Sequence, residues 1–512
     1  MSTRIPTGLL PRGRGRLAAC LLAAASLPGL GGCMVGPDYA RPSVETPLAF
    51  KQGGQREDSL AHVAAVRSGW RPIAPNDAAE RGDWWRIFND RTMDRLIRLV
   101  DVDNQTLRQS VASYTQARAL VEQARAALYP TVIGAPGITR QRAAGVQRTT
   151  VVLQGQASWE LDLFGRIRRN LESEVATAQS DAAALAATRL AIQAELATTY
   201  IELRYADSLQ RLLNETVAAY KRTLAIAENQ YAAGVAARSD VITAQTQVQT
   251  AEAQAIAVGL QRATYEHAIA LLVGRPPSEV TLPVTALAAR PPAVPVGIPS
   301  ALLERRPDVA QAERLVQASS EQIGVAVAAF FPTVTLSASG GISGPTSNGV
   351  FSAVNQVWSV GAAGSEVLFD GGARSAALQA SRAAYEASVA SYRQTVLTAF
   401  GEVENGLAGV RILARQQVAQ DAAVASARRA VEIALNEYRA GTQNFTTVVT
   451  AQALAFNNEV TALGVRLNRY TTAIALIRAL GGGWDASRLP TGAELKGPRL
   501  PIDSGSAVRP DE

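Results

Sequence analysis

Cysteine, histidine and methionine are scarce in this chain of 512 residues, which contains two, two and three of them. The two histidines, His62 and His267, lie far apart and lack the spacing of metal ligands. The sequence also has no phosphate-binding loop, no dinucleotide-binding glycine motif and no HExxH motif. These absences argue against an enzyme, and we expect no catalytic residues, no metal and no dissociable cofactor.

Long apolar runs and a large excess of one charge are absent as well. No apolar run of about 18 residues follows the amino terminus, so the sequence predicts no transmembrane helix. The 50 Lys and Arg residues nearly balance the 44 Asp and Glu residues. Nucleic-acid binding usually needs a clustered basic face, so we do not expect a nucleic-acid partner.

The amino terminus has the features of an export signal. Four arginines in residues 4–16 precede a short apolar stretch and the sequence Leu-Gly-Gly-Cys, which ends at Cys33. This ending resembles the lipobox of bacterial lipoproteins. The resemblance implies a signal peptide over residues 1–32, and a diacylglycerol and an N-acyl chain such as palmitate on Cys33. Met34 follows where Asp would favour retention in the inner membrane, which implies sorting to the outer membrane.

Two similar halves make up most of the remaining chain. Residues 127–132, Ala-Leu-Tyr-Pro-Thr-Val, return as Ala-Phe-Phe-Pro-Thr-Val at residues 329–334. Residues 229–234, Asn-Gln-Tyr-Ala-Ala-Gly, return as Asn-Glu-Tyr-Arg-Ala-Gly at residues 436–441. The spacing of about 205 residues is far longer than the period of a solenoid. The sequence therefore predicts two internal repeats, over residues 83–274 and 300–480.

Each repeat is predicted to contain a helix, a β-hairpin and two long helices. In the first repeat the first helix is expected over residues 83–129, which contain no Gly or Pro. Residues 166–233 contain no Gly or Pro and are rich in strong helix formers. A helix of that length would extend roughly 100 Å and needs partner helices along its whole length. We expect hairpins at about 131–164 and 333–369, and long helices at 166–233, 235–273, 373–440 and 442–480. The flanking parts are a lipidated extended segment (33–82), a Pro-rich linker (275–299) and a carboxy-terminal tail (481–512).

Two of the predicted strands alternate between apolar and polar residues. This period of two is clear in residues 152–163 and 333–339, and poor in the other strand of each hairpin, one of which is interrupted by Pro136. A half-buried strand of a soluble sheet would give the same pattern. A membrane strand is favoured by the strand length of about 10–12 residues and by aromatic residues at the strand ends. These aromatic residues are Tyr129, Trp159, Phe164, Phe330, Phe331 and Phe369.

Four strands are too few to close a membrane barrel, because the smallest barrels have about eight. An open strand edge in lipid would leave backbone amides and carbonyls without partners. The sequence therefore predicts a shared barrel. Three chains would supply twelve strands, giving an α+β membrane protein in which a trimeric twelve-stranded outer-membrane barrel continues into an α-helical barrel.

From residue 33 to about residue 484 the chain resembles the TolC-like outer-membrane efflux factors, in their lipoprotein branch. The motifs that carry the resemblance are Cys-Met-Val-Gly-Pro-Asp-Tyr at 33–39, Asp-Trp-Trp at 83–85, Trp-Glu-Leu-Asp-Leu-Phe-Gly at 159–165 and Leu-Leu-Glu-Arg-Arg-Pro-Asp at 302–308. The resemblance implies a homotrimer in the outer membrane, with its long helices in the periplasm. It also implies two partners, a periplasmic adaptor protein and an inner-membrane pump, in the export of drugs or other small molecules.

The resemblance places adaptor docking and the closing aperture at the tips of the long helices. The matching residues here are Tyr231, Gly234 and Asp240 in the first repeat, and Tyr438, Gly441, Thr447 and Thr450 in the second. Family members often carry Asp where this chain has Thr447 or Thr450. A ring of carboxylates at a pore mouth attracts cations, so we expect weaker cation block and weaker cation selectivity here, with Asp240 as a partial substitute.

Other functions remain open from the sequence. An outer-membrane channel for protein or peptide secretion would have the same architecture. Metal-ion efflux would also fit, although the chain has few of the Met and His residues that soft metal ions favour. A structural coiled-coil lipoprotein of the envelope would explain the long helices but not the alternating strands.

Overall fold

The computed structural model describes residues 34–47, 50–51, 83–292, 294, 302–345, 351 and 353–497. These residues fall into two compact units. The first, which we call the sheet unit, contains residues up to 40, residues 120–174 and residues 317–385. The second, the helix unit, contains residues 41–119, 175–316 and the chain from 386 onward. Each unit therefore takes segments from both predicted repeats.

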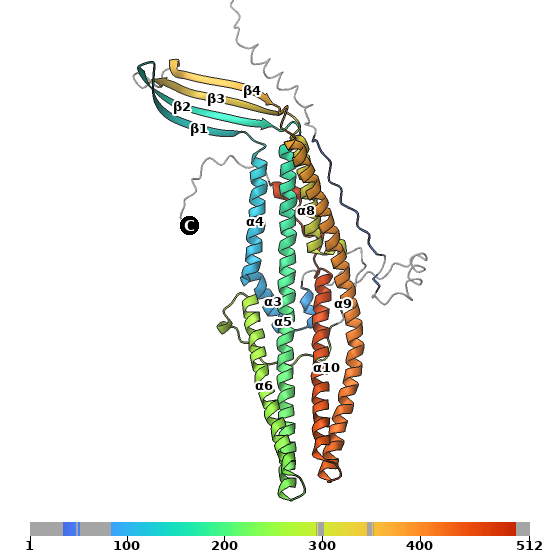
Figure 1. The fold of residues 1–512 in the computed structure, drawn as a ribbon. Coiled ribbons are helices and arrows are strands. Elements are labelled where there is room, and N and C mark those ends of the chain that lie inside the picture. Colours follow the sequence, from blue (N-terminus) through green and yellow to red (C-terminus); the bar gives the residue numbers. More distant parts are fainter. Residues whose placement is uncertain are drawn as a thin grey trace, which may run out of the picture. The chain divides into compact units, whose positions relative to one another are not determined.

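The four strands form one antiparallel sheet in the order β1-β2-β3-β4 (Figure 1). Strands β2 and β3 come from different repeats, and their pairing joins the two hairpins. Strand β1 continues through Pro136, where the sequence predicts an interruption. Proline is tolerated there because β1 is at an edge of the sheet within this chain. The strands are β1 (Thr131–Ala143), β2 (Val146–Leu161), β3 (Thr333–Pro345) and β4 (Gln356–Ser365).

The long helices have matching lengths in the two repeats. Helices α5 (Arg166–Ala232) and α9 (Ala373–Arg439) each have 67 residues, whereas α6 (Arg238–Leu272) and α10 (Phe445–Ala479) each have 35. Both ends of each of these four helices lie within three residues of the ends expected from the sequence. The shorter elements are η1 (Trp84–Phe88), α3 (Arg91–Asp103), α4 (Gln105–Ala126), η2 (Pro277–Glu279), α7 (Leu302–Arg305), α8 (Pro307–Ala328), η4 (Ala353–Asn355), η5 (Ala486–Arg488) and α11 (Gly492–Lys496).

The first helical stretch is not continuous, which corrects the expectation of one helix from residue 83 to residue 129. It is divided into η1, α3 and α4, and α3 ends before Asn104. The Asn104 side chain accepts a hydrogen bond from the amide of Leu107 (2.8 Å) and donates one to the carbonyl of Leu272 (2.7 Å). An Asn side chain that caps a new helix in this way competes with continuation of the old one.

Glycines inside α9 permit close packing against α10. A Cβ atom at Gly406 would lie 3.0 Å from a side-chain carbon of Leu476, and one at Gly409 would lie 2.8 Å from Thr472. The helix unit also contains the largest apolar core, which includes Trp85, Ile97 and Leu196. None of the described helices is long and apolar enough to cross a membrane.

Candidate functional site

The strand register divides the sheet into an apolar face and a polar face. Leu153 of β2 pairs with Pro136 of β1 and with Ile342 of β3, and residues paired in register point to the same side of a sheet. Most of the apolar residues of the four strands therefore share one side, whereas Ile133, Val152 and Val357 lie on the other. This apolar face includes Val132, Pro136 and Ile138; Val151, Leu153, Ala157, Trp159 and Leu161; Val334, Leu336, Ala338 and Ile342; and Trp358, Val360 and Ala362. Many of these side chains are exposed in the single chain, for example Trp358 at 81% and Val360 at 76%.

Amides and hydroxyls cover the opposite side of the sheet. Gln154 of β2 donates a hydrogen bond to the hydroxyl of Ser339 on β3 (3.3 Å), and Ser339 shares a hydrogen bond with Ser359 of β4 (2.9 Å). Gln156, Ser158 and Ser337 line a depression on this side together with the apolar Ile133. This polar face extends over three strands. Within the part of the chain that the structure describes, β1 pairs only with β2, and β4 pairs only with β3.

The aromatic residues expected at a membrane interface flank the same ends of the strands, because they precede β1 and β3 and lie at or after the ends of β2 and β4. The rings of Phe164 and Phe331 stack with their centroids 4.7 Å apart. The indole of Trp159 donates to the carbonyl of Leu128 (3.0 Å). The Arg374 guanidinium lies 5.3 Å from the ring centroid of Phe330. Tyr129 and Phe369 are exposed. Phe164 and Phe331 are thus in contact, and the other aromatic residues lie at the same ends of the strands. We call this end of the sheet the aromatic edge.

The tips of the long helices are tight turns that depend on glycine. Gly234 and Gly441 have φ values of +76° and +74°, in the left-handed region that glycine adopts at little cost. The amide of Gly234 donates to the carbonyl of Tyr231 (2.9 Å), and that of Gly441 donates to the carbonyl of Tyr438 (3.0 Å). These turns reverse the chain between α5 and α6 and between α9 and α10.

The two tips pack against each other within the helix unit. Ala227 and Ala244 of the first tip lie in one apolar cluster with Tyr438, Phe445 and Val448 of the second. The side chain of Gln230 also donates to the carbonyl of Tyr438 (3.1 Å). The equivalent tyrosines of the two repeats differ in exposure, since Tyr231 is 47% exposed and Tyr438 is 4% exposed.

The remaining polar residues of the tips have different environments. The Tyr438 side chain is buried. Burial raises the pKa of its hydroxyl, and the nearby carboxylate of Asp240 raises this pKa further. Thr447 donates to the side-chain oxygen of Asn444 (3.0 Å), which caps α10. Thr450 donates to the backbone carbonyl of Thr446 (2.9 Å). Both threonine hydroxyls therefore bond within their own helix turn and bring no charge to the tip.

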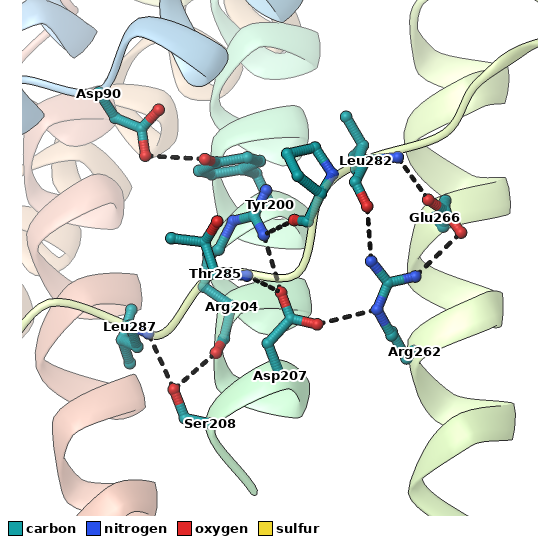
Figure 2. A network of polar contacts seen from close by, with 11 residues as sticks. Asp90, Tyr200, Arg204, Asp207, Ser208, Arg262, Glu266, Leu282, Thr285 and Leu287 are labelled. Carbon is teal, nitrogen blue, oxygen red and sulfur yellow. Dashed lines mark hydrogen bonds and ion pairs between the residues drawn. The ribbon is translucent and has the colours of Figure 1, made fainter. Parts of the chain in front are cut away.

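A charged network that the sequence analysis missed fixes the linker between the repeats (Figure 2). Asp207 of α5 is 1% exposed, and its carboxylate accepts from Arg204 (2.7 Å), from Arg262 of α6 (2.8 Å) and from the backbone amide of Thr285 (2.9 Å). The buried carboxylate is thus paired and hydrogen-bonded, as burial of a charge requires.

The same network also binds carbonyl groups of the linker. Arg204 donates to the carbonyl of Pro283 (2.6 Å), and Arg262 donates to that of Leu282 (2.7 Å). Glu266 accepts from the amide of Leu282 (2.6 Å). The linker is therefore fastened to α5 and α6 through its backbone. Charges three or four residues apart, such as Arg204 and Asp207, are a weak signal in the sequence because exposed helices often carry them.

Two further expectations from the sequence concern the lipid attachment at Cys33 and the absence of a metal site. Cys33 lies outside the described residues. Among the residues that are described, no group of three or more His, Cys, Asp or Glu could hold a metal ion.

A sequence model of the family described as "Outer membrane efflux protein" matches residues 96–275 and 298–482, well over half of the chain. The chain belongs to this family. Each matched segment covers most of one predicted repeat. The names of several relatives describe outer membrane proteins of efflux pumps.

Named relatives and solved structures agree with this assignment. The chain is 31% identical over 466 residues to the probable efflux pump outer membrane protein TtgC of Pseudomonas putida, covering 89% of this chain and 93% of the relative. It is 32% identical over 474 residues to the outer membrane protein OprJ of Pseudomonas aeruginosa, with 90% and 95% covered. The structure of the outer-membrane channel OprN matches with a TM-score of 0.78 and 30% identity, over 88% of this chain and all of that chain. The open-state MtrE channel of Neisseria gonorrhoeae matches with a TM-score of 0.76 and 25% identity, over 89% and 99%.

Proposed function

We propose that this family member is one subunit of a homotrimeric outer-membrane channel that exports small molecules. The observation that carries the proposal is the single apolar face extending over all four strands, together with the two strand edges that have no partner strand among the described residues. Lipid would cover the apolar face. On β2 this face extends from Val151 to Leu161, about 11 residues, which is the length a tilted strand needs to cross the hydrocarbon layer.

The two edges are compatible with pairing between subunits. Neighbouring strands in the sheet are antiparallel, so β1 and β4 run in opposite directions. The β4 edge of one subunit would therefore meet the β1 edge of the next in antiparallel orientation. Three subunits would give twelve strands with no free edge, which satisfies the backbone in lipid. The polar face, including Gln154 and Ser339, would line the lumen.

The assembly can be tested directly on acylated protein purified in mild detergent. Light scattering after gel filtration should give three chains per particle, and reconstitution into planar bilayers should give discrete conductance steps. A monodisperse single chain without conductance would refute both the trimer and the channel.

The cargo and partners are proposed from relatives. Their names include toluene, antibiotic and solvent efflux pumps of Pseudomonas putida. We therefore favour drugs or solvents as cargo, delivered by an inner-membrane pump and a periplasmic adaptor. The adaptor would dock on the helix tips around Tyr231, Gly234 and Gly441. A strain lacking this gene should become more sensitive to these compounds and accumulate an efflux dye. Unchanged sensitivity combined with loss of a secreted protein would favour protein secretion instead.

Attachment to the outer membrane is proposed through Cys33. Mass spectrometry of the mature protein should find an amino-terminal cysteine that carries a diacylglycerol and an N-acyl chain, and the acylated protein should fractionate with the outer membrane. The Cys33→Ser variant should lack the lipid. An unmodified amino-terminal peptide from the wild-type protein would refute the anchor without affecting the channel proposal.

A further inference from the structure

Arg169 is the most deeply buried cation at the end of the sheet unit where α5 begins. Its side chain is 2% exposed, and one end of the guanidinium donates to the carboxylate of Glu321 on α8 at 2.9 Å. Glu321 is itself only 7% exposed. The pair joins a helix of the first repeat to a helix of the second. A buried charge requires a partner of this kind, because an unpaired one would be very costly.

The other donors of Arg169 bind the first described residues of the chain. Nε donates to the carbonyl of Val35 (3.3 Å), and Nη2 donates to the carbonyl of Gly36 (3.3 Å) and to the carboxylate of Asp38 (3.0 Å). We call residues 34–38 the amino-terminal strap. A planar guanidinium presents its donors in a fixed geometry, so one side chain can hold several acceptors at once.

Glycines allow the strap to lie directly on the helices. A Cβ atom at Gly36 would be 2.7 Å from the Cα atom of Gly324 on α8, and one at Gly165 would be 2.9 Å from the Cα atom of Met34. The amide of Val35 donates to the carbonyl of Phe164 (3.2 Å). The strap is therefore held by backbone hydrogen bonds and close packing as well as by charge.

We infer that Arg169 and Glu321 form a binding site for the amino-terminal strap, which we call the seat, and that this site fixes the acylated amino terminus at the strand ends. The inference rests on the proposed lipid attachment to Cys33. Residue 33 is one peptide bond from Met34, and consecutive Cα atoms are about 3.8 Å apart. Met34, to which a lipidated residue 33 would be joined, lies against Gly165, and the neighbouring Phe164 stacks on Phe331. The partner of this seat is the membrane surface, which receives the acyl chains at the level of the aromatic edge of the sheet. Arg169 acts as a positioning residue for the anchor.

The seat can be tested by hydrogen exchange of the strap in the acylated protein. The double variant Arg169→Met/Glu321→Met removes the donors without leaving a buried unpaired charge. Gly324→Ala keeps both charges, but its Cβ atom would lie 2.8 Å from Arg169 Cδ and would push the Arg169 side chain away from its position on the strap. Arg166→Met is the matched control, because Arg166 pairs with Glu160 instead (2.7 Å).

We expect the amides of Val35, Gly36 and Asp38 to exchange slowly in the wild type and in the control, above all that of Val35, which donates to the carbonyl of Phe164. In both test variants they should exchange at least about tenfold faster, since each lost hydrogen bond to a charged donor changes the opening equilibrium by about that factor or more. Strap amides that exchange freely in the wild type, or that remain equally protected in both test variants, would overturn the inference. The acylation state is read separately from the intact mass. A protected strap on an unacylated chain would leave the seat in place for the polypeptide and refute the lipid anchor alone.

Discussion

Placing one arginine on each face of β4 would test the assignment of the apolar face. Val360 pairs with Ala338 on the apolar face, whereas the adjacent Ser359 pairs with Ser339 on the polar face. Arginine on a lipid-facing strand costs about 2–4 kcal/mol near the centre of the bilayer. Three copies of Val360→Arg in a trimer would therefore destabilise the assembly by about 6–12 kcal/mol if the sites are independent. Ser359→Arg would lose one exposed hydroxyl contact, about 0.5–1.5 kcal/mol per chain.

The measurement is equilibrium unfolding from lipid vesicles in urea, with trimer on a gel and conductance as second readouts. We expect Val360→Arg to lower the transition midpoint strongly or to prevent insertion, and Ser359→Arg to insert and conduct. If Ser359→Arg were the more damaging change, the two faces would be assigned the wrong way round. If both variants matched the wild type within about 1 kcal/mol, the sheet would not contact lipid at all.

Three further predictions concern the helices. In a thermal unfolding assay, Gly234→Ala and Gly441→Ala should each lower the free energy of unfolding by about 1 kcal/mol, because both glycines have positive φ values. Gly401→Ala inside α9 is the control, and it should be neutral or stabilising because a Cβ atom there meets nothing within 4 Å. Burial raises the pKa of Tyr200 to about 12. Its contribution to stability is therefore complete below the unfolded pKa of about 10 and is lost as the pH rises towards 12. Tyr200→Phe should make the free energy of unfolding fall less steeply at alkaline pH, and an unchanged alkaline pH dependence would contradict this. Thr447→Asp should increase block by multivalent cations in planar bilayers, and unaltered block would remove Thr447 from the pore mouth.

Small residues explain why only half of the sheet was clear from the sequence. Strands β2 and β3 alternate visibly, whereas β1 and β4 place residues such as Gly134 and Ala362 on the apolar face. Glycine and alanine carry little hydropathy signal, so the face of these strands becomes evident only from their register with Leu153 and its neighbours. The aromatic edge was predictable because it depends on position along the strands, but the contact between Phe164 and Phe331 joins two repeats and has no local signal.

The long helices could be predicted well because their sequences lack proline and are rich in strong helix formers, and their bounds depend on nearby glycines such as Gly234. The break at Asn104 was missed because its cap is secured by the carbonyl of Leu272, far away in the sequence. The Asp207 network was missed for a similar reason, since half of its partners are backbone groups of the linker. Features that depend on distant backbone groups leave no pattern in the surrounding residues.

The two repeats are alike in their hairpins and long helices and differ at the helix tips, where they pack against each other. Each contributes one hairpin and one pair of helices with the same lengths, and the β2–β3 pairing merges the hairpins into one sheet. An isolated two-stranded hairpin is marginally stable, so each repeat depends on the other for its sheet. At the tips, equivalent tyrosines are exposed in one repeat and buried in the other, and the buried Tyr438 packs on Phe445 with ring centroids 5.2 Å apart. Two identical chains related by symmetry would have equivalent tips, whereas fused repeats can differ. Fusion therefore permits Tyr231 to remain accessible at one tip while Tyr438 packs into the bundle at the other. The two repeats have thus diverged in structure at the tips and not in the sheet.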